Sequence, residues 1–198
     1  MLKIIEEMNY EPNVMARALV ANKVYHIAAL IPDHTKDSYW LAPREGIEKA
    51  AKDLKQFGIR IKQYIFDPFN LKSFVENANL LSRENTDGIL VSPIFYHESL
   101  PFLRKWHKKK IPVILFNTQI TEYDPLSYVG QDSYQSGLLA GKLIHYGQSG
   151  PCSTLIAHID EEISNSIHLQ KKEKGFGALA AEWWLCYWLY RRKIFFKA

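Results

Sequence analysis

Between Tyr25 and Ile159 the sequence repeats one pattern: a short apolar run, a polar corner, and then a segment with helical periodicity. Several of the apolar runs are uninterrupted, which is typical of strands buried on both faces of a parallel sheet. The predicted strands are His26–Ile31, Ile59–Phe66, Gly88–Val91, Val113–Phe116, Tyr128–Gly130 and Thr154–Ala157. Strands that alternate with helices are joined by right-handed crossovers. The sequence therefore predicts an α/β fold, a parallel sheet with helices on both faces.

The segments between these strands carry the helical spacing. In the first of them Ile47, Ala51 and Leu54 recur on one face, and Gly58 follows where a helix C-cap glycine belongs. The predicted helices are Pro43–Phe57, Leu71–Asn85, Ser99–Lys110 and Ser133–Tyr146.

Composition narrows the class of protein. The 198 residues are 47% hydrophobic and 23% charged, as in an ordinary soluble globular protein. The net charge of +4 is too small to indicate a nucleic-acid surface by itself. Cys152 and Cys186 lack metal-ligand spacing and are interpreted as reduced thiols. Neither a signal peptide nor a long apolar span is recognisable, so we expect a cytoplasmic protein with no membrane association and no metal.

Motifs of catalysis are absent from the sequence. It has no glycine-rich dinucleotide or phosphate loop after a strand, no His-Glu-x-x-His and no Gly-x-Ser-x-Gly. Asp33 and His34 are adjacent, but neighbouring side chains point apart. We therefore expect a binding protein without a cofactor rather than an enzyme.

The most specific string is Tyr-Glu-Pro-Asn-Val-Met-Ala-Arg-Ala-Leu, residues 10–19. Pro12 ends a preceding helix and Asn13 is a good N-cap for the next one. The string resembles the hinge segment of the lactose/purine repressor (LacI-type) family. That resemblance implies DNA contact through a hinge helix, with a leucine wedged between base pairs of the minor groove. The corresponding residues are Tyr10, Asn13, Ala16, Arg17 and Leu19. The alternative is an ordinary capped helix whose Leu19 packs on the core.

Two downstream strings extend the resemblance. Tyr128–Gly137 with Ala140–Leu143 is similar to the family's strand–Asp–helix segment, and Lys172–Phe176 to its Arg-x-x-Gly-Phe helix. The resemblance implies a periplasmic-binding-protein type I effector domain preceded by a hinge helix. We expect a headpiece remnant and hinge at 1–22, a first lobe at 23–146, and the start of a second lobe at 147–176. A complete relative would also have a helix-turn-helix and a full second lobe, so we expect a truncated chain.

Residues 177–198 break the pattern, because an aromatic stretch with Trp183, Trp184 and Trp188 follows without a turn signal or a recognisable strand. Three interpretations remain open. The tail is a terminal helix packed on the core, a membrane-surface helix flanked by Arg191 and Arg192, or a sequence that is not the natural continuation.

Candidate ligand residues lie where the predicted strands end, because open α/β sheets bind ligands at the carboxyl ends of their strands. They are Asp33, Tyr39, Trp40, Ser92, Asn117 and Asp132, with Lys172 from the last motif. Such a set combines polar groups for sugar hydroxyls with aromatic faces for the ring. By resemblance, Asn117 occupies the place of a ligand-facing Asp, and Lys172 that of an Arg. Asp33 and Asp132 have the alternative role of capping the helices that follow.

Together these features predict a sugar-responsive transcription regulator of the repressor type, a homodimer whose intact form binds operator DNA. Ligand would close the two lobes and change the grip of the hinge helices. Two alternatives stay open. One is a periplasmic-type sugar receptor without a DNA-binding role. The other is a free-standing regulator that dimerises with intact relatives through its aromatic tail.

Overall fold

A computed structural model describes residues 24–149, 153–158, 167–182 and 186–191. The elements of the first lobe are β1 (Tyr25–Pro32), η1 (Ser38–Trp40), α3 (Leu41–Leu54), η2 (Lys55–Phe57), β2 (Ile59–Phe66), α4 (Leu71–Arg83), β3 (Gly88–Val91), α5 (Tyr96–Lys108), β4 (Val113–Phe116) and β5 (Ser127–Val129). The hinge residues Tyr10, Asn13, Ala16, Arg17 and Leu19 lie outside the described residues.

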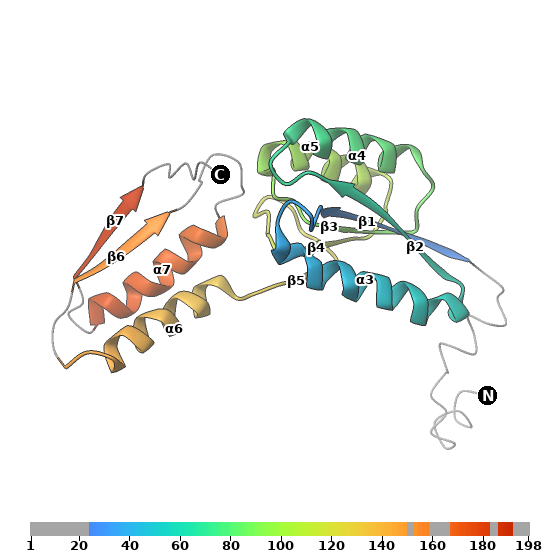
Figure 1. The fold of residues 1–198 in the computed structure, drawn as a ribbon. Coiled ribbons are helices and arrows are strands. Elements are labelled where there is room, and N and C mark those ends of the chain that lie inside the picture. The colour runs from blue at the N-terminus through green and yellow to red at the C-terminus, as the bar shows by residue number, and fades with distance from the viewer. Residues whose placement is uncertain (1–23, 150–152, 159–166, 183–185, 192–198) are drawn as a thin grey trace, which may run out of the picture.

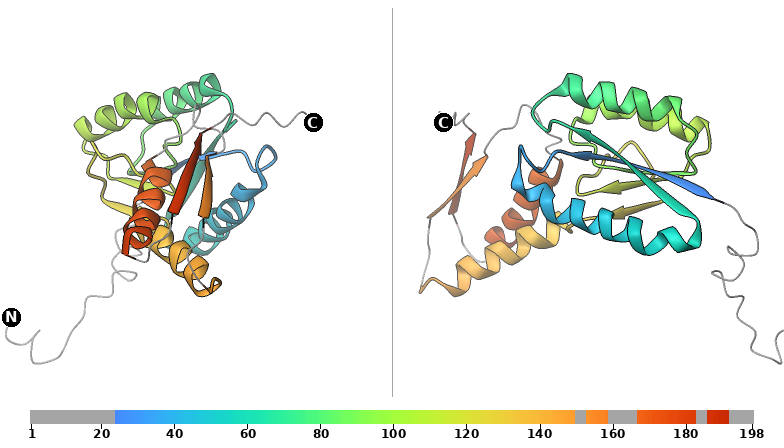
Figure 2. Two further views of the ribbon diagram at one scale, coloured as in Figure 1. Left: turned by 90° about the vertical axis from the view of Figure 1, so that its left-hand side faces the viewer. Right: turned by 45° about the vertical axis from the view of Figure 1, so that its right-hand side comes forward.

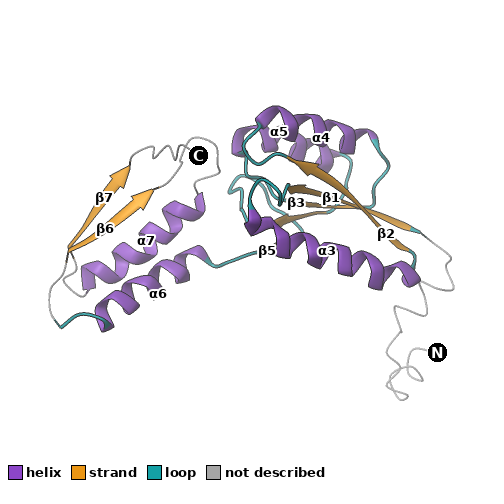
Figure 3. Ribbon diagram, viewed as in Figure 1, coloured by secondary structure: helices purple, strands orange, loops and turns teal. Residues whose placement is uncertain are grey.

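The centre of the first lobe is a five-stranded sheet with the order β2-β1-β3-β4-β5, and every neighbouring pair is parallel. α3 covers one face of the sheet, and α4 and α5 cover the other (Figure 1; Figure 3 gives the same view by element type). The predicted α/β fold is confirmed, and so are the predicted strands and helices between residues 25 and 146, to within a few residues at their ends.

The main hydrophobic core lies between the sheet and α4 and α5. Its largest fully buried side chains include Phe66, Phe74, Leu103 and Trp106. By contrast, α3 has no fully buried residue. Its predicted apolar stripe is present, but Ile47 and Leu54 are only half-buried. One face of the sheet is therefore much more densely covered than the other.

Local signals explain where the helices begin and end. The Asn70 side chain accepts hydrogen bonds from the backbone N–H groups of Lys72 and Ser73, which caps α4. Gly58 has a φ of 76°, in the left-handed region that glycine reaches without strain, and it ends the helical stretch before β2.

The second lobe contains α6 (Ser133–Tyr146), β6 (Ser153–His158), α7 (Ile167–Glu182) and β7 (Cys186–Arg191). Its two strands form a separate parallel pair beside the packed helices α6 and α7 (Figures 1 and 2). The sequence analysis assigned α6 to the first lobe, but the helix packs against α7. Gly137 and Gly175 make this possible, because a Cβ at either position would lie about 2 Å from a backbone oxygen of the other helix (1.9 and 2.1 Å).

The segment that begins at residue 177 is also more regular than expected. α7 continues to Glu182, and Cys186–Arg191 forms β7, which pairs with β6 in register from Ser153↔Cys186 to His158↔Arg191. The expectation that no strand follows is therefore wrong. Aromatic residues favour strands, but the partner strand lies about thirty residues earlier, beyond the reach of a local pattern.

Among the described residues, no helix is long and apolar enough to cross a membrane.

Candidate functional site

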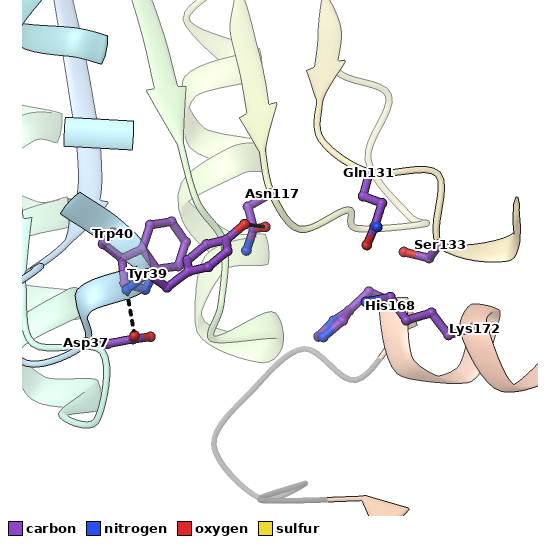
Figure 4. Close-up of a pocket in the computed structure, with 8 residues that line it drawn as sticks. All are labelled: Asp37, Tyr39, Trp40, Asn117, Gln131, Ser133, His168 and Lys172. Carbon is purple, nitrogen blue, oxygen red and sulfur yellow. Dashed lines mark hydrogen bonds between the residues drawn. The ribbon is translucent and has the colours of Figure 1, made fainter. Parts of the chain in front are cut away.

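A pocket of about 530 Å³ lies between the carboxyl edge of the five-stranded sheet and the second lobe. Its walls come from both lobes (Figure 4). The lining residues are Asp37, Tyr39, Trp40, Asn117, Gln131, Ser133, His168 and Lys172. Four of the seven predicted ligand residues are therefore brought together: Tyr39, Trp40, Asn117 and Lys172.

The loop after β1 supplies the aromatic wall. The Asp37 carboxylate accepts a hydrogen bond of 3.0 Å from the Tyr39 backbone N–H and so begins the short helix η1. Trp40 is buried, and its ring packs at 6.1 Å against Phe116 at the end of β4. Tyr39 packs edge-on against Trp40 and is 57% exposed, so its ring is available to a ligand.

Asn117 follows β4 and forms the floor of the first-lobe side. Its φ is 62°, a left-handed conformation that Asn tolerates better than most residues. Its Oδ1 accepts a 2.7 Å hydrogen bond from the Tyr39 hydroxyl, and its carbonyl oxygen accepts a 3.0 Å bond from the Tyr128 hydroxyl. Burial raises the pKa of Tyr128, which keeps this phenol protonated as a donor. The side chain is thus held by Tyr39, with its amide N–H₂ left to face a ligand.

The second-lobe side is built from the start of α6 and of α7. Gln131 and Ser133 flank Asp132, the N-cap of α6, and His168 and Lys172 lie one turn apart on α7. His168 extends from α7 toward the first lobe (Figure 4). The two lobes are also joined directly, because the ammonium of Lys171 donates a hydrogen bond to the Gln119 side chain.

Three predicted ligand residues do not line this pocket. Asp33 accepts a hydrogen bond from the Thr35 backbone N–H, which lowers the pKa of the carboxyl, and it lies 3.5 Å from His34. Ser92 is fully buried at the end of β3. Asp132 accepts from the Gln135 backbone N–H, so it has the capping role that the sequence left open.

The sequence analysis in turn missed four lining residues. Asp37 lies two residues before the predicted ligand residue Tyr39, and Gln131 and Ser133 are the neighbours of Asp132. His168 had a usable signal, because it stands four residues before Lys172 and so shares its helix face.

The chemistry of the pocket suits a neutral, hydroxyl-rich molecule. Amide, hydroxyl and imidazole groups provide donors and acceptors, and a carboxylate (Asp37) and an ammonium (Lys172) come from different lobes. Aromatic rings beside these polar groups are the usual arrangement of a small-molecule site. Within the described residues, no group of three or more His, Cys, Asp or Glu side chains could hold a metal ion.

Comparisons with known proteins agree with this architecture. Residues 27–185 match the family of the periplasmic binding protein domain. The catabolite repressor/activator of Escherichia coli K12 is 28% identical over 142 residues, which are 72% of this chain and 41% of that protein. The HTH-type transcriptional regulator DegA of Bacillus subtilis is also 28% identical over 142 residues, which are 71% of this chain and 40% of DegA. The chain thus spans about two fifths of the length of the curated relatives it matches.

Solved structures show the same fold. A protein assigned as a LacI transcriptional regulator from Bacteroides fragilis superposes with a TM-score of 0.73 at 24% identity, over 87% of this chain and 60% of that one. GanP, a glucose-galactose binding protein from Geobacillus stearothermophilus, gives a TM-score of 0.70 at 22% identity, over 85% of this chain and 57% of GanP.

The predicted resemblance to LacI-type regulators and to the periplasmic-binding-protein fold is confirmed, and these relatives are not enzymes. With most of its length matched, from the first strand to the end of α7, the chain belongs to the periplasmic binding protein domain family.

Proposed function

We propose that the chain is the effector-binding part of a LacI-type transcription regulator and that it takes a sugar in the pocket between its lobes. The observation that carries the proposal is the pocket itself, whose polar and aromatic walls come from both lobes. A ligand that contacts both walls favours one arrangement of the lobes, which is how an effector shifts a conformational equilibrium.

Names of related proteins support the two halves of the proposal. The curated relatives are a catabolite repressor/activator and an HTH-type transcriptional regulator. Structural neighbours include a glucose-galactose binding protein and a periplasmic ribose ABC transporter. We propose Tyr39, Trp40, Asn117 and Lys172 as ligand residues, and we add Asp37, Gln131, Ser133 and His168. Asp33, Ser92 and Asp132 do not line the pocket. We propose that they support its walls from the ends of the strands without touching the ligand.

The DNA-binding half rests on the sequence string at residues 10–19. We propose that these residues form a hinge helix, that the intact regulator is a cytoplasmic homodimer acting as a repressor, and that operator DNA is its partner.

Titration calorimetry with a panel of pentoses and hexoses tests the ligand proposal. We expect saturable binding of at least one sugar and a loss of about tenfold or more in the Asn117→Ala variant, because a buried ligand hydroxyl would lose its hydrogen-bond partner. Asn79→Ala, at an exposed position of α4, is the matched control and should bind like the parent. Equal affinity of the two variants would contradict the proposed site.

The second candidate is a sugar-binding receptor without a DNA-binding role, favoured by the likeness to GanP. Sugar binding alone does not separate the two functions. A gel shift with operator fragments does, using the chain joined to a helix-turn-helix: sugar-dependent retardation supports the regulator, and its absence supports the receptor.

A further inference from the structure

The residues at the end of α5 form the strongest concentration of charge in the described structure. The segment Arg104–Lys110, here called the basic segment, contains five Lys and Arg residues, one His and no acid. The whole chain has 25 basic and 21 acidic residues, so the 20 basic residues outside the segment are balanced by 21 acidic ones. The net positive charge of the protein is therefore concentrated in this segment.

The charges of the basic segment are exposed, and two carboxylates lie near two of its residues without forming ion pairs with them. Every Lys and Arg in it is exposed, and within the described residues none of them forms an ion pair. Glu122 and Asp124 face Arg104 and Lys108 across a hollow of about 390 Å³ without bonding to them. The ammonium of Lys109 donates a hydrogen bond to the backbone carbonyl of Ser82.

Helix electrostatics accounts for only part of this pattern. One or two cations in the last turn of a helix are stabilised by its dipole. The segment goes further, because Arg104 and Lys108 repel each other at a spacing of four residues, and the run continues past the end of α5 to Lys110. A cluster of exposed like charges on one surface is typical of a protein that binds a polyanion.

The position of the basic segment in the fold favours DNA as this polyanion. In a parallel sheet all strands begin at the same edge, and the basic segment leads directly into β4 at that edge. β1 also begins there, and it is the strand that follows residues 1–23 with the hinge-like string. Only β3 separates β1 from β4, and the start of β4 lies level with Ala28, three residues inside β1. The two starting points are therefore about 14 Å apart, from two strand spacings and an offset of three residues. A duplex held by the hinge would pass close to the basic segment.

We propose that the basic segment is an auxiliary DNA-backbone contact, which binds phosphates without reading sequence. This inference rests on the proposed regulator function, since it assumes that the hinge brings a duplex to this edge. Lysine and arginine contacts to phosphates release counterions, so binding through them weakens steeply as salt is raised.

The test uses the 198-residue chain and a fluorescent duplex of arbitrary sequence, with anisotropy measured between about 50 and 200 mM salt. In one variant Lys105, Lys108 and Lys110 are changed to Gln. The control changes Lys36, Lys72 and Lys142 to Gln. It removes the same charge from exposed positions that are away from the edge where the strands begin. Circular dichroism checks that both variants are folded.

We expect the parent to bind the duplex, with log K decreasing as log salt rises. In the basic-segment variant this negative slope should become shallower by about 2 to 3, because three phosphate contacts are lost. The control variant should keep the slope of the parent. The proposal is overturned if the parent does not bind duplex DNA at low salt, or if both variants show the same slope. Sugar titrations on the same preparations keep the two proposals apart. If the protein binds a sugar but not DNA, only the inference about the basic segment is contradicted. If it binds DNA but no sugar, the proposed effector function is contradicted.

Discussion

The two lobes are held together by opposite kinds of packing. In the first lobe, large side chains fill the space between α4, α5 and the sheet, with Phe74, Leu103 and Trp106 each at most 1% exposed. In the second lobe, α6 and α7 touch through glycines, and Phe176 and Leu179 are buried beside this contact.

The two kinds of packing have different consequences for the stability of the protein and for the geometry of the pocket. Burial of large apolar side chains supplies most of the free energy of folding, so we expect the first lobe, with its large buried core, to be the stable half. A glycine contact stabilises less, but it fixes how closely two helices approach. Because Ser133 starts α6 and Lys172 lies on α7, the spacing of these helices positions one wall of the pocket.

The largest effect is expected from Leu103→Ala in α5. The side chain is fully buried, so its truncation should lower the free energy of unfolding by about 3 kcal/mol. Urea denaturation followed by circular dichroism measures the change. Leu80→Ala on α4, where the side chain is 52% exposed, is the matched control and should change stability by no more than about 0.5 kcal/mol. Equal losses of stability in both variants would contradict the expectation that the buried core makes the first lobe the more stable one.

Gly137→Ala should break the second kind of packing. A Cβ at this position would lie 1.9 Å from the Lys172 carbonyl oxygen, so the helices must move apart, at a cost of about 2 kcal/mol. Limited proteolysis should show faster cleavage in the second lobe, and sugar binding should weaken because Lys172 moves. Unchanged cleavage and unchanged affinity together would show that the close approach has no role.

Ser82→Ala tests the polar contact inside the first-lobe core. The buried Trp106 Nε1–H donates a 2.9 Å hydrogen bond to the Ser82 hydroxyl, and this N–H would be left without a partner. We expect a loss of about 1 kcal/mol in the urea experiment. Ser127→Ala at an exposed position of β5 should have no measurable effect, and a similar loss there would point to a general effect of serine removal.

The smallest effect, and the only stabilising one, is expected from Gly46→Ala in α3. Nothing lies within 4 Å of a Cβ at this position, so the helix gains alanine's propensity without a clash. Thermal unfolding should show a gain of about 0.5 to 1 kcal/mol. A loss would mean that glycine at position 46 is required for packing, as it is at position 137.

Sequence patterns predicted the first lobe well because its signals are local. Continuous apolar runs and helical stripes are set by near neighbours, and the resulting elements match the observed ones. The packing of α6 against α7 could not be predicted in this way. Its partner α7 begins about twenty residues after α6 ends, and the glycines that join the two helices have no periodic signature.

The residues of the pocket were likewise predictable only where the signal is local in the sequence. Strand ends are predictable, and they correctly placed Trp40 and Asn117 at one edge of the sheet. The side to which a side chain points is not predictable in the same way. Ser92 ends a strand like Asn117, yet it is fully buried, and His168 arrives from a helix far along the chain.

In the described residues the two lobes are covalently connected through the short link from β5 to α6, residues 130–132. Each lobe can thus be regarded as one arm of a bivalent receptor on a very short tether. A ligand held by one arm meets the other at a high effective concentration, so modest contacts on each side combine into firm binding. Lengthening this link would then reduce affinity with every contact residue left in place.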